Sequence, residues 1–214
     1  MKIEIGKEFP TYFQSAYPEE FELFSHFETT SAIPQVLFAI TTWKENGMGN
    51  VCFHSWSCFH GDHTKFFAVM GGLYQHTHTY ANIKREGCFC INFLPIRYYD
   101  QLINTIHDNE IESDEFKAGK FTLSHAKKIH APRIEESFLT LVCTFKEDLD
   151  LSGAGITTMI VGEVIYAWIE ETMASGYARH GEDGFMMLIP APQNLKSGEP
   201  GQTAIANLDI KKYD

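Results

Sequence analysis

Gln75-His-Thr-His-Thr-Tyr-Ala-Asn-Ile-Lys-Arg-Glu-Gly87 is the stretch around which the rest of the chain can be ordered. It predicts a short helix, because Thr79 can cap the helix start and Gly87 is a common stop residue. A helix start presents unpaired backbone N–H groups and the positive end of the helix dipole. Since hydroxyls and imidazoles flank this start, the stretch predicts a site for an anion such as a phosphate.

Strand-like segments lie on both sides of this helix. Residues 34–43 are apolar at nearly every position, as expected of a strand that is buried on both faces. Gly162 interrupts another apolar run, which indicates a bulge or a close approach. Strands are predicted at residues 34–43, 50–59, 65–70, 88–94, 138–145, 157–169 and 185–189. The other predicted parts are a helical or irregular lead-in over residues 1–31 whose aromatic face packs on the body, a helix at 98–107, a surface excursion at 116–133 and a polar tail at 190–214. These elements and their hairpin-like links predict a mainly β fold, an antiparallel barrel with short helical insertions.

The strand predicted over residues 50–59 carries small polar side chains in an otherwise apolar setting. Strand alternation places Ser55 and Ser57 on one face, with Trp56 and its neighbours His54 and Cys58 on the other. Serines beside a tryptophan favour a planar polar ligand such as an isoalloxazine, whose edge needs hydrogen bonds and whose faces need apolar cover. An ordinary strand with serines paired to neighbours or water is the alternative.

Composition narrows the class of protein. The chain has 214 residues, of which 44% are hydrophobic, and no Gly/Ser-rich or Pro-rich linker divides it, so one domain over residues 1–214 is predicted. The net charge of -11 and scattered lysines and arginines disfavour nucleic acid and an anionic membrane surface as partners. An acidic N-terminus without an apolar run and the lack of a span-length segment favour the cytoplasm. The five cysteines show no disulfide or metal rhythm and are expected to be reduced apolar fillers.

Other interpretations of the helix stretch stay open at the level of residues. A solvated helix start with ordinary capping is one. A metal at His76 and His78 is another, although no partner pair stands at recognised spacing, and no histidine is singled out as a catalytic acid or base. Neither a Rossmann nor a P-loop glycine pattern occurs, and no Gly-x-Ser-x-Gly elbow supports a hydrolase.

Several pieces of the chain, taken in order, resemble the flavin reductase-like, FMN-binding split-barrel family, particularly its flavoredoxin branch. The resemblance covers about residues 30 to 170. The pieces that carry it are Pro34-Gln35-Val36-Leu37 leading to Thr41-Thr42, Gly49-Asn50, Ser55-Trp56-Ser57, Thr79-Tyr80-Ala81-Asn82-Ile83, Asn92, Asp114-Glu115-Phe116, Gly119, residues 131–137, Cys143 and Ile160-Val161-Gly162-Glu163-Val164.

The resemblance implies a Greek-key-like split β-barrel homodimer that holds one FMN per subunit near the dimer interface. NADH, NADPH or an electron-transfer protein would donate electrons, and the flavin would carry the chemistry. Carried over by position, the isoalloxazine and ribityl contacts are Asn50, Ser55, Trp56, Ser57 and Cys58, the phosphate contacts are His76, Thr77, His78 and Thr79, and the supporting contacts are Thr42 and Asn82.

The function expected from these observations is that of an FMN-binding oxidoreductase. A non-catalytic FMN-binding electron carrier, or a split barrel that binds another planar cofactor such as haem, is the alternative. Family members commonly place Lys or Arg at the phosphate, whereas this chain has His76 and His78 there. We therefore predict that FMN binding weakens as pH rises from 6 to 8, because imidazoles lose their charge in this range.

Overall fold

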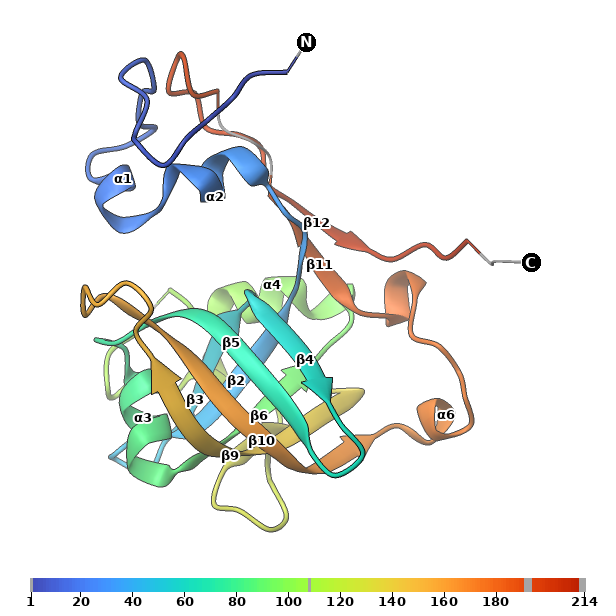
Figure 1. Cartoon of the computed structure of the whole chain (residues 1–214). Coiled ribbons are helices and arrows are strands. Elements are labelled where there is room, and N and C mark those ends of the chain that lie inside the picture. The colour runs from blue at the N-terminus through green and yellow to red at the C-terminus, as the bar shows by residue number, and fades with distance from the viewer. Residues whose placement is uncertain (1, 108, 191–193, 212–214) are drawn as a thin grey trace. The chain divides into compact units, whose positions relative to one another are not determined.

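A seven-stranded antiparallel sheet forms the body of the computed structural model, which describes residues 2–107, 109–190 and 194–211 (Figure 1). The strands lie in the order β3-β2-β6-β9-β10-β5-β4, and every neighbouring pair is antiparallel. Their bounds are β2 Phe38–Trp43, β3 Gly49–His54, β4 Ser57–Gly61, β5 Phe66–Tyr74, β6 Cys88–Phe93, β9 Leu139–Leu149 and β10 Thr157–Ile169.

The order of the strands requires the sheet to curl. Its two edge strands, β3 and β4, are consecutive in the sequence and are separated only by Ser55 and Trp56. Two residues span a short distance, so the first and last strands of the sheet must come together. The sheet is therefore a barrel that is left open between β3 and β4, and the predicted mainly β split barrel is confirmed.

Apolar side chains from most strands of the sheet meet inside the barrel. Phe38, Met70, Phe89 and Ile160 are members of this core, and each is completely buried. All residues of β2 and β6 are buried, because helix α3 (His78–Glu86) and strand β8 (Pro132–Ile134) contact both strands on the outside. The prediction of one strand buried on both faces over residues 34–43 holds only for β2, since Gln35–Val36 (β1) are half-buried and belong to another sheet. A Cβ on Gly162 would lie 2.5 Å from the ring of Phe89, so the predicted close approach is present.

The segment predicted as a surface excursion, residues 116–133, is instead partly core. Phe116, Phe121 and Ala131 are buried. The amide of Asn92 holds this region to the sheet, since its Oδ1 accepts from the backbone N–H of Ile134 at 3.1 Å. The elements around it are η1 Ile96–Tyr98, α4 Tyr99–Asn104, α5 Glu115–Ala118 and β7 Leu123–His125, and those after β10 are α6 Glu171–Ala174 and η2 Gly181–Asp183.

Three other predicted elements differ from the structure. The strand predicted over residues 50–59 is two strands, β3 and β4. The strand predicted to end at residue 70 continues through two glycines to Tyr74, because β5 keeps antiparallel partners in β10 up to that residue. The polar tail contains a strand, β12 (Ala204–Asn207), whereas residues 191–193 and 212–214 of that tail lie outside the described residues.

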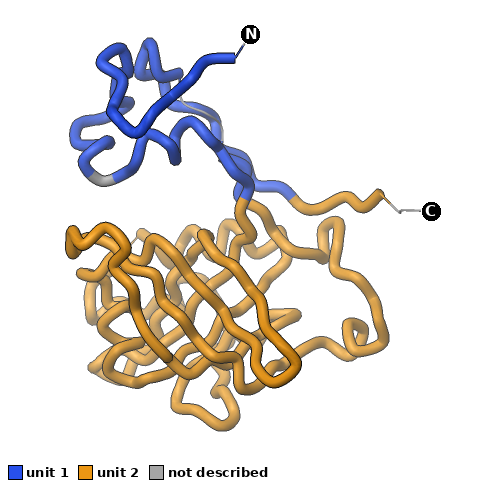
Figure 2. The backbone as a smooth tube through the Cα atoms, in the orientation of Figure 1, with its two compact units in different colours: residues 1–34, 188–206 blue, residues 35–187, 207–214 orange. Residues whose placement is uncertain are grey.

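The chain packs as two compact units (Figure 2). Unit 2 comprises residues 35–187 and 207–214 and includes the whole seven-stranded sheet. Unit 1 comprises residues 1–34 and 188–206, with helices α1 (Glu20–Leu23) and α2 (His26–Ser31). Strands β1 (Gln35–Val36), β11 (Met186–Ile189) and β12 form a separate sheet. The single domain over residues 1–214 and the packing of the lead-in on the body stay predictions.

Candidate functional site

Helix α3 is capped at both ends, by Thr77 and by Gly87. Thr77 is the N-cap: its backbone is extended, and its Oγ1 accepts from the N–H of Tyr80 at 3.3 Å. The prediction that Thr79 caps the helix is wrong, because Thr79 already lies inside the first turn. Gly87 ends the helix as predicted, with a φ of 67° and its N–H bonded to the carbonyl of Ile83 at 2.9 Å.

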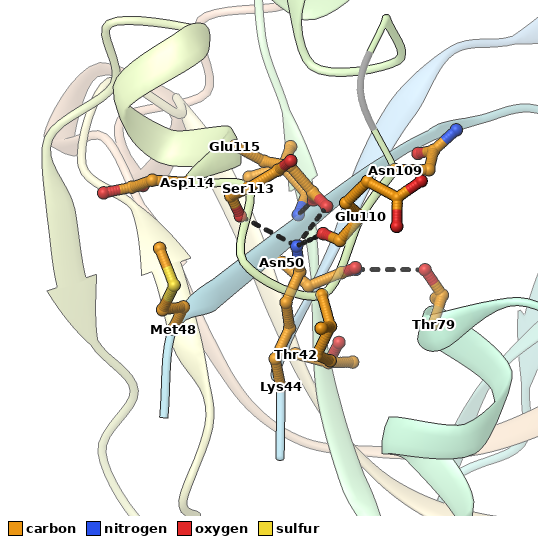
Figure 3. Close-up of polar contacts among 12 residues, drawn as sticks. Thr42, Lys44, Met48, Asn50, Thr79, Asn109, Glu110, Ser113, Asp114 and Glu115 are labelled. Atoms are coloured by element: carbon orange, nitrogen blue, oxygen red, sulfur yellow. Dashed lines mark hydrogen bonds and ion pairs between the residues drawn. The ribbon is translucent and has the colours of Figure 1, made fainter. Parts of the chain in front are cut away.

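Two buried hydrogen bonds attach α3 to the sheet. The Nδ2 of Asn50 in β3 donates to Oγ1 of Thr79 at 3.0 Å (Figure 3). The Nδ2 of Asn82, one turn further along the helix, donates to Oγ1 of Thr42 in β2 at 3.0 Å. The structure thus joins four of the predicted site residues in two pairs, and these pairs fix the start of α3 against the edge of the sheet.

The remaining predicted phosphate residues precede the helix. The hydroxyl of Thr77 is already used, since it donates to the carbonyl of Tyr74 at 2.8 Å besides capping the helix. The ring of His76 packs beside that of Tyr74, at 5.4 Å between centroids. His78 is the first residue of α3 and is partly buried. The Thr77 hydroxyl is therefore occupied, and the groups at this helix start that could still meet an anion are the N–H groups of His78 and Thr79 and the two imidazoles.

Residues 55–58 depart from the predicted strand alternation. Ser55 and Trp56 belong to no strand, and Trp56 has a φ of 48°, which turns the backbone and cancels the simple alternation of faces. Ser55 is buried, while Trp56 and Cys58 are exposed, so Cys58 is not the buried filler expected. The Oγ of Ser57 is buried and has no hydrogen-bond partner among the described residues.

The sequence prediction missed Lys44 and Glu115 as parts of this region. The side chain of Lys44 is fully buried, and its Nζ lies 2.9 Å from Oε1 of Glu115 and donates to the carbonyls of Ser113 and Glu110 (Figure 3). The other carboxylate oxygen of Glu115 accepts from the N–H of Val51, next to Asn50. A lysine at the start of a turn that contains Asn46-Gly47 is expected to be solvated, so only the fold reveals this ion pair.

Burial governs the titration of two groups near Asn50. It raises the pKa of Glu115, against the lowering effect of Lys44, of the Val51 N–H and of His78. It also raises the pKa of the Cys52 thiol to about 11, so this thiol stays protonated near neutral pH. Cys52 lies beside Thr79 and packs against the core of the barrel.

The described residues offer neither a metal-binding cluster nor a membrane-spanning helix. No group of three or more His, Cys, Asp or Glu side chains is arranged to hold a metal ion in residues 2–107, 109–190 and 194–211. Within those same ranges, no helix is both long and apolar enough to cross a membrane.

Comparison with known proteins identifies the family. A model of the flavin reductase like domain matches residues 30–185. Similar solved structures are nitrilotriacetate monooxygenase component B from Bacillus cereus (TM-score 0.72, 15% identity, 94% of this chain and 98% of that chain), flavoredoxin from Methanosarcina acetivorans (0.69, 17%, 100% and 95%) and an FMN-binding protein from Thermus thermophilus (0.65, 13%, 85% and 90%). No curated protein matches the sequence. At these identities the structural likenesses show a shared fold.

Proposed function

This chain belongs to the flavin reductase like domain family, and we propose from that membership that it is an FMN-binding oxidoreductase. In this proposal, electrons pass from NADH, NADPH or an electron-transfer protein through the flavin to an acceptor, and the protein acts as a homodimer. The observation that carries the proposal is the bond of 3.0 Å between Asn50 and Thr79, which secures a helix start to the edge of the split barrel.

The residues present fit a flavin at two places. In the first turn of α3 the N–H of Tyr80 is bonded to Oγ1 of Thr77, whereas the N–H groups of His78 and Thr79 have no acceptor within the helix and can receive a phosphate. The buried Oγ of Ser57 has no partner among the described residues, and the polar edge of a ring would supply one. Because folded proteins rarely leave buried polar groups unpaired, this hydroxyl supports a ligand at residues 55–58.

The protein's own residues would bind and orient the cofactor. The start of α3, with Thr79 fixed by Asn50, would hold the phosphate, and residues 55–58 would line the ring. Arg85 stabilises the far end of the helix, since its Nη1 donates to Oδ1 of Asn82 at 3.0 Å. A bound flavin itself supplies the hydride and single-electron chemistry, so the protein needs no acid, base or nucleophile.

The absorbance spectrum of the purified protein, after incubation with FMN and desalting, tests cofactor binding. We expect a flavin band at about 450 nm and release of FMN on denaturation. Chromatography of the released cofactor distinguishes FMN from FAD. A colourless protein that fails to retain either flavin, or a red protein with a haem band, would refute the proposal.

Anaerobic mixing of the loaded protein with NADH and with NADPH tests the reaction. We expect the flavin band to bleach with at least one nicotinamide. If neither nicotinamide bleaches it while dithionite does, the protein is an electron carrier instead. Light scattering coupled to gel filtration gives the mass in solution, and a monomeric mass would exclude the proposed homodimer.

A further inference from the structure

The crossover between the two edge strands, Ser55 and Trp56, is held by a contact that the sequence does not suggest. His54 is the last residue of β3, and its Nε2 lies 2.9 Å from the carbonyl oxygen of Gly71 in β5. A carbonyl only accepts hydrogen bonds, so Nε2 donates and the ring can remain neutral. β5 pairs with β4, the opposite edge strand. The side chain of His54 therefore connects one edge of the open barrel to the strand behind the other edge.

Gly71 holds the crossover from its other side as well. Its N–H donates to the carbonyl of Trp56 at 2.7 Å. The regular ladder between β4 and β5 ends at the pair Ser57 and Met70, so this bond continues the pairing one residue beyond the ladder. The backbone of Gly71 thus makes two bonds: its carbonyl accepts from the side chain of His54, just before the crossover, and its N–H donates to the carbonyl of Trp56 within the crossover.

The backbone of the crossover is strained at Trp56. Trp56 has a φ of 48°, in a region that bulky side chains rarely adopt, and its side chain is 44% exposed. Such a conformation persists only where the surroundings impose it. The N–H of Gly71 holds the carbonyl of Trp56 itself, and the carbonyl of Gly71 holds the side chain of His54 just before the turn. Directly after this turn comes Ser57, whose Oγ is buried without a partner among the described residues.

We propose that His54 is a positioning residue for flavin binding: its bond to Gly71 sets the crossover in the geometry that presents Ser57 and the backbone of residues 55–58 to the ring. The inference rests on the proposed function and deepens it. Burial lowers the pKa of His54 to about 4, so the ring stays neutral near neutral pH and its bond to the Gly71 carbonyl does not depend on a charge. The ring also packs on Phe38, with centroids 5.7 Å apart, so a substitution must preserve this packing.

Two substitutions of His54 and one matched control test the proposal. His54→Phe keeps an aromatic ring but removes the donor, whereas His54→Gln retains an N–H donor. His60→Phe makes the same chemical change at an exposed position of β4. We expect His54→Phe to weaken FMN binding at least about 10-fold and to shift the absorbance band of bound FMN, and His54→Gln and His60→Phe to bind within about 3-fold of wild type.

The readouts separate this proposal from the proposed function. If the wild-type protein binds no flavin, both proposals fail. If it binds FMN and His54→Phe binds with unchanged affinity and spectrum, only the role of His54 is refuted. A general loss of folding would instead appear as a lower Tm in both His54 variants, with no rescue of binding by glutamine, and it would also count against the proposal.

Amide exchange in the wild-type protein covers the case in which His54→Phe does not fold. The N–H of Gly71 should be protected from exchange in the free protein because it is bonded to the carbonyl of Trp56. FMN should slow this exchange at least about 10-fold further, because a ligand that binds the bonded crossover stabilises it. An unprotected Gly71 amide, or one whose exchange FMN leaves unchanged, would overturn the proposal.

Discussion

Lys44 shows how much one side chain can depend on a distant segment. Its ammonium is fully buried and reaches Glu115 and the carbonyls of residues 110 and 113, all far away in the sequence. A buried charge needs such partners because transfer from water costs far more than an exposed ion pair contributes. The pair also fixes β3 beside Asn50, because Glu115 accepts from the N–H of Val51.

We predict that Lys44→Met lowers the free energy of unfolding by about 3 to 5 kcal/mol, because it leaves the Glu115 carboxylate buried without a cation. The double variant Lys44→Met/Glu115→Gln should recover part of this loss. Lys65→Met, which breaks an exposed pair with Glu163, should cost less than about 1 kcal/mol. Urea unfolding measures all three. Equal losses in the buried and exposed single variants would contradict the prediction.

His54 makes stability depend on pH in a defined direction. Its pKa is about 4 in the folded protein, lowered by burial, and an unfolded histidine has a pKa of about 6.5. Between these values the unfolded state binds the proton more strongly, so stability falls as pH falls from about 6.5 to 4. We expect this residue to contribute a loss of roughly 3 kcal/mol over that window.

The variant His54→Gln isolates that contribution, because glutamine does not titrate. Urea unfolding of both proteins at several pH values between 4 and 7 should give a steeper decline for wild type. The difference between the two free energies of unfolding should therefore change with pH. Parallel curves over this interval would show that His54 titrates normally.

At the level of elements, local signals predicted types better than boundaries. Gly87 predicted the helix end correctly because a left-handed C-cap is a local requirement. Thr77 and Thr79 both stand near the helix start; the structure uses Thr77 as the N-cap, while Thr79 lies in the first turn and is bonded to Asn50 of β3. Likewise, nothing local breaks the run over residues 50–59; the break arises because the chain passes from one edge of the barrel to the other.

The cap of α3 can be tested at Gly87. Its φ of 67° favours glycine, and an added Cβ would meet no atom within 4 Å, so only backbone strain opposes a substitution. We predict that Gly87→Ala lowers the free energy of unfolding by about 1 kcal/mol and Gly87→Asn by less, because asparagine tolerates the left-handed region better. Thermal unfolding measures both variants. A cost for asparagine equal to or above that for alanine would argue against this explanation.

For the whole molecule, the sequence predicted the barrel, but not the bonds that connect the candidate site residues to one another. The strands carry their own apolar patterns, so their presence could be inferred. The bond between Asn50 and Thr79 and the burial of Lys44 depend on long-range pairing, which one sequence does not contain. Unit 1 is likewise assembled from residues 1–34 and 188–206, and one sequence does not show that segments so distant in the chain belong to the same unit.

The two units give a last prediction, about independent folding. All seven strands of the large sheet and its core cluster lie within residues 35–187, as do all predicted flavin contacts. A fragment of residues 30–187, roughly 160 residues long, is large enough to bury a core of its own. We expect it to unfold cooperatively in urea and to bind FMN within about 10-fold of the full chain, because none of these contacts comes from unit 1.

The full-length protein is the reference for this fragment, and the same fragment with His54→Phe should lose affinity for FMN as the full chain does. A fragment that unfolds without a cooperative transition, or that folds but retains no FMN while the full chain does, would show that residues of unit 1 are needed for the barrel or for its site.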